Sequence, residues 1–199
     1  MEYRIGDSNV VPVTTAVPTC ETGNGEANDA VSTVSATEYG AGLVHKTVLT
    51  LEDFTVAMSD AAGTTGYGGA KLYDLPEGAI CFLGAVADLD LTKSSAGIDD
   101  DWDGDFSVGT DTAGTDASLS LTEANIIPST ATPQASGGVT TAAGQTGTAG
   151  STVVDGTATA LDVYLNLLVD DADHDITSTA ANIVVDGTVT LSWMNLGDN

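Results

Sequence analysis

The sequence has almost no basic residues. It contains 29 aspartates and glutamates against four lysines and arginines, and no basic residue follows Lys93. Nucleic-acid binding depends on lysines and arginines that neutralise phosphates, and anionic lipid surfaces attract the same side chains. The composition therefore excludes nucleic acid and anionic membranes as partners.

Long apolar runs and a leader segment are also missing. No stretch reaches the roughly 18 apolar residues expected of a membrane span. Residues 1–7 lack the cationic and apolar regions of a secretory signal, so we expect synthesis in the cytoplasm without secretory export, a trimmed mature chain being the alternative. The two cysteines, Cys20 and Cys81, lie far apart and predict no disulfide framework. Cys81 sits in an apolar run and is expected to be a buried free thiol.

Good helix formers other than alanine are scarce, and aromatic residues make up only 5% of the chain. Glycine, threonine, alanine, serine and valine dominate, and β-branched residues favour strands. A length of 199 residues fits one domain. These features predict an all-β protein, a β-sandwich that is most simply a jelly roll.

The predicted domain organisation has two parts. Residues 1–40 read as an extended N-terminal arm, within which a short helix over residues 27–39 is a weak alternative. Residues 41–199 are expected to form a single β-sandwich domain. Within that domain, residues 129–151 are low-complexity Thr/Ala/Gly/Ser sequence and predict a long surface loop.

The strand predicted at residues 45–58 carries a change of phase. Leu49 and Leu51 share one parity, whereas Phe54 and the alternate apolar residues after it share the other. Side chains of a strand alternate strictly between its two faces. The chain must therefore bend or bulge near residues 52–53 to keep both sets inside.

Further strands are predicted from apolar patterning. Residues 79–87 are apolar on both faces, as in a central strand covered on both sides. Residues 161–169 alternate apolar side chains with Asp162, Tyr164 and Asn166, which predicts one buried and one polar face. Shorter strands are expected at residues 105–109, 118–122 and 189–193.

The dipeptide Asp-Gly occurs twice between β-branched residues, at residues 155–156 and at residues 186–187. Asp-Gly in such a setting is a strong signal for a two-residue hairpin turn. We therefore expect recurring turn chemistry at both places.

Residues 99–105 form the sharpest candidate for a metal site. Alternate aspartates followed by Gly104 match the opening of a calcium loop, D-x-D-x-D-G. The carboxylates concerned are Asp99, Asp101, Asp103 and Asp105. Thr110 stands where the closing glutamate belongs, and no flanking helices are predicted, so a solvated acidic turn is the simpler interpretation.

A second acidic cluster and the two tryptophans are further candidates for binding. Residues 170–175 form a second acidic cluster around His174, which suits either a metal site or an acidic loop. Trp102 is a candidate for stacking on a sugar ring, whereas Trp193 has the pattern of a core residue.

Catalytic motifs are missing. The sequence contains no G-x-S-x-G, no H-E-x-x-H and no P-loop, and it has two histidines and two cysteines in all. We therefore predict that the chain is not an enzyme and needs no cofactor, calcium excepted.

Several short turn-and-strand segments share one further property. They are residues 71–78, Ile80, residues 83–86, residues 104–110, residues 126–130, Tyr164-Leu165-Asn166 and residues 193–198. Together they resemble a family of tailed-bacteriophage virion structural proteins that are encoded near the major capsid protein, and the resemblance covers roughly residues 45–199.

The resemblance implies a capsid decoration, or cement, protein that binds the outer surface of the assembled capsid lattice and stabilises it. The implied partners are the major capsid protein and further copies of the chain, with a homotrimer favoured. The implied location is the outer capsid surface of the virion. A head-fibre module or a receptor- or carbohydrate-binding virion module, with or without calcium, is the alternative.

The N-terminal arm offers a candidate interface. The segment that contains Val10, Val11, Val13 and Val17 is punctuated by prolines, and we expect it either to lie as an extended strand on a neighbouring subunit or to be a disordered terminus.

Overall fold

The computed structural model describes residues 26–27, 33–40, 43–60, 65–94, 96–113, 118–146, 152–170 and 181–197. Nearly all of the regular structure in these ranges is strand. The exception is η1, a single 3₁₀ turn at Leu121–Ala124, and no described helix is long enough to cross a membrane. The strands are β1 (Glu26–Ala27), β2 (Val34–Tyr39), β3 (Val44–Asp60), β4 (Thr65–Asp74), β5 (Gly78–Lys93), β6 (Gly104–Gly109), β7 (Ile127–Thr132), β8 (Val139–Gln145), β9 (Thr152–Gly156), β10 (Asp162–Asp170) and β11 (Ala181–Asn195).

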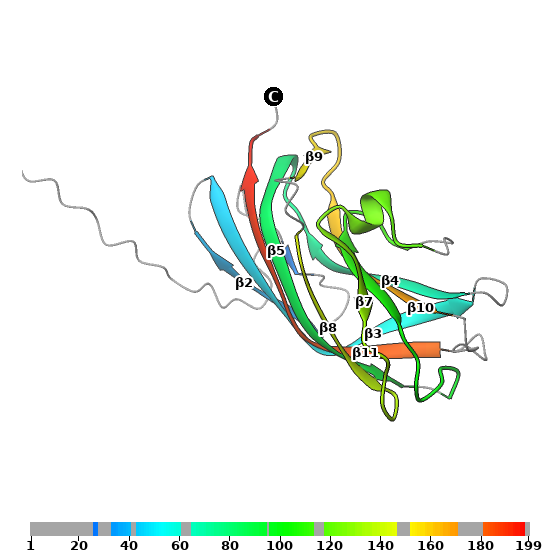
Figure 1. Ribbon diagram of the computed structural model, residues 1–199. Coiled ribbons are helices and arrows are strands. Elements are labelled where there is room, and N and C mark those ends of the chain that lie inside the picture. The colour runs from blue at the N-terminus through cyan, green and yellow to red at the C-terminus, as the bar shows by residue number, and fades with distance from the viewer. Residues whose placement is uncertain are drawn as a thin grey trace, which may run out of the picture.

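The strands form two facing antiparallel layers that belong to one curled sheet. The first layer runs β8-β5-β11-β3, and the second runs β7-β6-β10-β4. The last residues of β3, Ser59 and Asp60, pair with the start of β4 and join the layers. Figure 1 shows that the long strands β3, β5 and β11 are strongly curved along their length.

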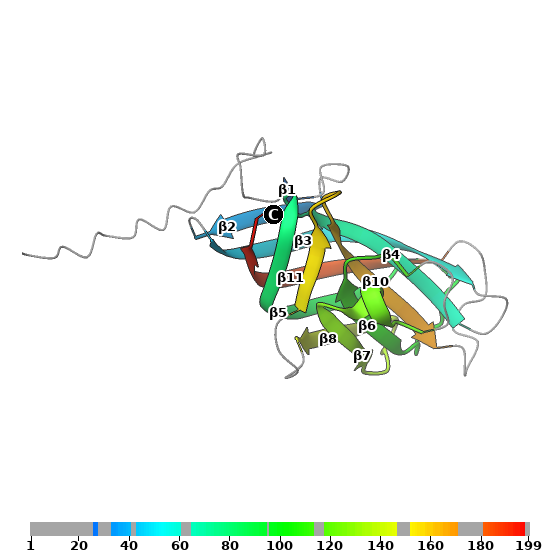
Figure 2. The same cartoon turned by 90° about the horizontal axis from the view of Figure 1, so that it is seen from above.

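The path of the chain is that of a jelly roll. Successive strands β3, β4, β5 and β6 alternate between the layers, β7 stays beside β6, and β8, β10 and β11 then alternate again. Both layers therefore contain neighbours that are distant in sequence, as two Greek keys require. The additional strands β2, β9 and β1 extend the layers along β3, β5 and β4 (Figure 2). The predicted all-β jelly-roll sandwich is confirmed.

The main core lies between the layers, and Ala113, Leu119 and Leu168 form a second, small cluster. The largest fully buried side chains include Trp102, Trp193, Phe54, Phe82 and Phe106. Trp193 is thus a core residue, as predicted. Trp102 is only 1% exposed and its indole N–H donates to the Gly138 carbonyl at 3.2 Å, so the expectation that it stacks on a sugar is wrong.

The predicted bend in β3 is present at Asp53. This residue has a positive φ of 53°, and the pairing of β3 with β11 shifts register opposite it, between Val185 and Gly187. Leu49 and Leu51 before the bend and Phe54 after it all point into the core. The bend therefore resolves the phase change that the sequence contains.

Gly187 makes the same irregularity possible on β11. Its φ is 129°, and a Cβ there would lie 2.3 Å from the Asp88 carbonyl oxygen, so only glycine fits. The Asp-Gly pair at residues 186–187 consequently sits inside a long strand, and the hairpin turn predicted there is wrong. At residues 155–156 the other pair does end a strand, and Asp155 accepts hydrogen bonds from the Thr157 N–H and hydroxyl group.

The loop predicted at residues 129–151 is wrong at residues 129–132 and 139–145, which lie in strands. Residues 127–132 form β7 and residues 139–145 form β8. Their side chains alternate between buried and exposed, as with buried Thr140 and Ala142 and exposed Thr141, but they are too small to give a hydropathy signal. Gly144 faces Phe106, and a Cβ would lie 2.6 Å from the ring, so β8 approaches β6 closely.

Two boundaries also differ from prediction. The sheet includes β1 and β2, so it begins before residue 41, and residues 34–39 are a strand rather than a helix because β2 pairs with β3. The strand predicted at residues 118–122 is replaced by η1, which Ser120 and Glu123 begin with a reciprocal capping box.

Candidate functional site

A row of apolar side chains crosses the outer surface of the first layer. Val153 of β9 pairs with Cys81 of β5, Cys81 pairs with Met194 of β11, and Met194 pairs with Val44 of β3. Val153 is 59% exposed and Val44 is 51% exposed, whereas Cys81 and Met194 are half-buried. Four neighbouring strands thus present apolar side chains at one level of the sheet.

Two further residues of β5 enlarge this surface. The pairing of β5 with β11 shifts register between Ser192 and Trp193, which leaves Leu83 as an additional residue of β5. Leu83 is 46% exposed, and Val86 beyond it is 54% exposed. We call the set Val44, Cys81, Leu83, Val86, Val153 and Met194 the apolar band.

The band lies within a part of the sheet that carries no carboxylate on its outer face among the described residues. The paired positions next to it are occupied by Ser192, Lys46 and Tyr39, and then by Thr190 and Val48 beside Val86. The Lys46 ammonium lies 5.9 Å from the Tyr39 ring centroid. The nearest carboxylates on this face border the band: Asp155 of β9 pairs with Ala79, and Asp88 of β5 pairs with Thr188.

The band corrects one prediction about β5. Residues 79–87 were expected to be covered on both faces, but the described structure covers only the inner face, where Ile80 and Phe82 are fully buried. Cys81, expected to be a buried thiol, is free and half-buried on the outer face. The sequence of β5 therefore has an apolar pattern on a face that the described part of the chain leaves open.

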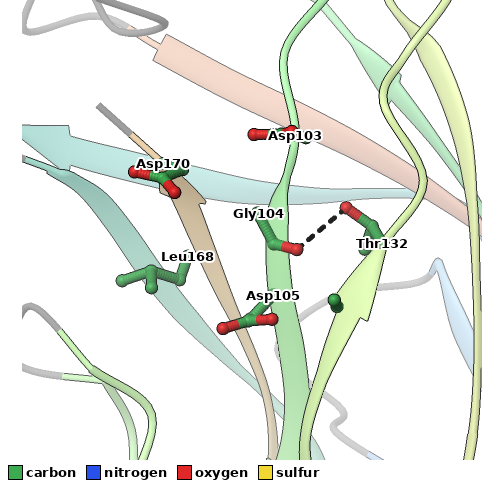
Figure 3. Close-up of a pocket in the computed structure, with 7 residues that line it drawn as sticks. Asp103, Gly104, Asp105, Thr132, Leu168 and Asp170 are labelled. Atoms are coloured by element: carbon green, nitrogen blue, oxygen red, sulfur yellow. Dashed lines mark hydrogen bonds between the residues drawn. The ribbon is translucent and has the colours of Figure 1, made fainter. Parts of the chain in front are cut away.

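An acidic pocket lies in the second layer, where β7, β6 and β10 run side by side (Figure 3). It is open and shallow, about 170 Å³ in volume, and Asp103, Asp105 and Asp170 line it. The Asp170 N–H donates to the Asp103 carbonyl at 3.0 Å, and the Thr132 hydroxyl donates to the Gly104 carbonyl at 3.1 Å. The start of the second acidic cluster is thereby placed beside the first.

The four predicted calcium ligands are divided by this arrangement. Asp103 and Asp105 enter the pocket, whereas Asp99 and Asp101 belong to the preceding turn and do not line it. Asp100, between them, forms an ion pair with Lys93. Among the residues that the structure describes, no three carboxylate, histidine or cysteine side chains gather closely enough to hold a metal ion. The calcium-loop arrangement is not found there.

A buried polar network is the feature that sequence analysis missed. Glu38 of β2 is 8% exposed, and its Oε1 accepts hydrogen bonds from the Thr47 hydroxyl at 2.7 Å and from the Tyr73 hydroxyl. The Thr47 oxygen in turn accepts the Trp193 indole N–H at 2.8 Å. His45 stacks on Trp193 with ring centroids 4.2 Å apart, so this histidine is structural.

Burial dominates the electrostatics of this network. Removal from water raises the pKa of Glu38, against the lowering effect of the two hydroxyl donors and of nearby His45. Its second oxygen, Oε2, has no hydrogen-bond partner within the described structure. Predicting the strands alone would not have found this network, because the network forms only where Glu38 of β2 lies against Tyr73 of β4.

The predicted arm residues Val10, Val11, Val13 and Val17 lie outside the described residues. A scan of protein-family models and a search of curated proteins both find no match to the chain.

Proposed function

We propose that this chain is a tailed-bacteriophage capsid decoration protein, which binds the outer surface of the assembled capsid lattice and stabilises it. The observation that carries the proposal is the convergence of the segments on which the family resemblance rests. Tyr164 pairs with Lys71 on one side and with Gly109 on the other, and Val108 pairs with Ile127. Segments spread over about half of the sequence thus form four adjacent strands.

The character of the surface supports the same proposal. Two pockets among the described residues are open, with Asp103 and Asp105 in the lining of one and Thr110, Asn125 and Val153 in the lining of the other. The broad sheet face presents exposed apolar side chains such as Leu83 and Val86. Exposed apolar surface of this kind marks protein–protein contact more than small-molecule chemistry.

The net charge of −25 is consistent with a position outside the shell. Carboxylates repel the packaged nucleic acid, and they keep exposed strand edges from pairing with other chains. The mechanism of stabilisation is mass action. A protein that binds the assembled lattice but not free capsid subunits shifts the equilibrium away from disassembly.

The proposal is tested with capsids prepared without this chain. Purified chain should co-sediment with assembled capsids at a fixed stoichiometry, should not bind unassembled capsid subunits, and should raise the temperature at which the shells disassemble. An unrelated protein of equal size and net charge controls for nonspecific electrostatic effects. Cryo-electron microscopy of the virion should place the chain on the outer shell, and a map without it there contradicts the proposal.

A further inference from the structure

We propose that the apolar band is the contact surface between copies of this chain, so that a second copy covers it. The first argument is the sequence of β5. Residues 79–87 are apolar towards both faces, a pattern that belongs to strands covered on both sides. In the described structure the outer residues Leu83 and Val86 remain 46% and 54% exposed. The residues that the structure describes leave this face open, and we infer that a second copy completes the cover.

The arrangement of the exposed residues supports one contiguous contact. Val153, Cys81, Met194 and Val44 are direct cross-strand partners, and Cβ atoms of such partners lie about 5 Å apart. The residues therefore form a continuous strip across β9, β5, β11 and β3. Single exposed apolar residues are ordinary on protein surfaces, but a contiguous strip is characteristic of an interface.

The distribution of charge indicates which molecule covers the apolar band. The chain carries 29 acidic residues, so two copies that meet through most of their surface bring carboxylates together. The band itself has no carboxylate, its described neighbours on the outer face include Lys46, one of only four basic residues, and the carboxylates Asp155 and Asp88 stand only at its border. Like charges at an interface are costly, and an acid-free face removes that cost for a partner that is itself acidic. A second copy of the chain has this property and carries the complementary apolar surface.

A basic partner would be expected at a different place. The pocket around Asp103, Asp105 and Asp170 offers attraction to lysines and arginines, whereas the side chains of the band itself offer none. The band is thus suited to contact between acidic molecules. This inference does not depend on the proposed capsid function, because it concerns the purified chain alone.

Analytical ultracentrifugation over a concentration series provides the main test. The wild type should sediment as a dimer or trimer, and added sodium chloride should strengthen association because it screens repulsion between the acidic copies. The double variant Val86→Asp/Val153→Asp places carboxylates in the band and should weaken association at least about tenfold. The matched control Val139→Asp changes a valine that is 47% exposed on β8, outside the band, and should associate like the wild type.

Cys81 supplies a second measurement that does not depend on a substitution in the band. In a chain with Cys20→Ser, the rate of Cys81 alkylation should fall as the protein concentration rises, because a second copy covers the thiol. Circular dichroism confirms that each variant keeps its strand content.

Three results would overturn the inference: a wild type that stays monomeric at every concentration, a double variant that associates as tightly as the wild type, or Cys81 reactivity that is independent of concentration. Protection of Cys81 only on addition of capsids would assign the band to the capsid lattice instead. That result would overturn self-association while leaving the proposed decoration function intact.

Discussion

The backbone N–H of Asp53 donates a hydrogen bond to the Asp186 carboxylate at 2.8 Å, although the two residues are 133 positions apart. The contact joins the bend of β3 to the irregularity of β11. Asp186 also stands directly opposite Asp90 of β5, so the carboxylate that accepts this bond faces a like charge. The Asp186 side chain therefore stabilises the bend and also repels Asp90.

Substitution of Asp186 separates these two effects. Asp186→Ala removes the acceptor and should lower the free energy of unfolding by about 1 kcal/mol, whereas Asp186→Asn retains an acceptor oxygen, loses the repulsion with Asp90 and should be neutral or slightly stabilising. Urea unfolding at neutral pH measures both. Equal destabilisation by the two substitutions would show that the hydrogen bond to Asp53 does not support the bend.

The bend illustrates what patterning can predict. The parity of Leu49, Leu51 and Phe54 is written in the sequence, and strict alternation of faces makes an irregularity between them unavoidable. β7 and β8 could not be found in this way, because the side chains that they bury, such as Thr140 and Ala142, are too small to leave a hydropathy pattern. Local sequence predicts where β3 must bend, but it does not predict that the small residues of β7 and β8 form strands.

The site was less predictable than the fold. The meeting of Asp103 with Asp170 and the burial of Glu38 are consequences of topology, which places β6 beside β10 and brings Glu38 of β2 against Tyr73 of β4. The apolar band was visible as a doubly apolar segment in β5. Its meaning was misjudged, because the sequence does not reveal whether the cover comes from the same chain.

Asn166 shows how tertiary structure overrides alternation. Its position in β10 predicts an outward, polar side chain, yet it is fully buried beneath the segment that contains η1. Its amide nitrogen donates to the carbonyls of Asp111 and Glu123, each at 2.9 Å, and its Oδ1 accepts the Ala113 N–H at 2.7 Å. The side chain thus satisfies three backbone groups.

Asn166→Asp should therefore be severely destabilising. A carboxylate cannot donate to the two carbonyls, and a buried acceptor that faces acceptors costs about 3 kcal/mol or more. Tyr164→Phe on the same strand removes only a half-buried hydroxyl that donates to Asp162 at 3.0 Å, and should cost less than about 1 kcal/mol. Chemical denaturation compares them, and similar losses would contradict the role assigned to Asn166.

Glu38 should give the chain a pH-dependent component of stability. The ordinary pKa of a glutamate is 4.5, and burial raises that of Glu38 in the folded state, so folding takes up a proton between the two values. The resulting stabilisation is complete below the unfolded pKa and is lost as the pH rises through the folded pKa. Tyr73, Thr47 and His45 surround the group.

The variant Glu38→Gln should remove this component. Its free energy of unfolding, minus that of the wild type, should increase as the pH is raised from about 4.5 towards neutrality, where the wild type holds a buried charge. The exposed Glu52→Gln controls for the loss of one negative charge. Unfolding in urea at a series of pH values measures the difference, and a difference that does not change with pH would refute the prediction.

The acidic pocket should destabilise the fold at low ionic strength. Asp105 shares it with Asp103 and Asp170, and mutual repulsion among partly solvated carboxylates is expected to cost a few tenths of a kcal/mol, roughly 0.5. Asp105→Asn should thus raise the free energy of unfolding, and the gain should disappear as salt screens the charges. Glu77→Gln, at an exposed residue just before β5, lowers the net charge equally and should give a smaller gain. Thermal unfolding across a sodium chloride series distinguishes the two, because equal gains would attribute the effect to net charge rather than to the pocket.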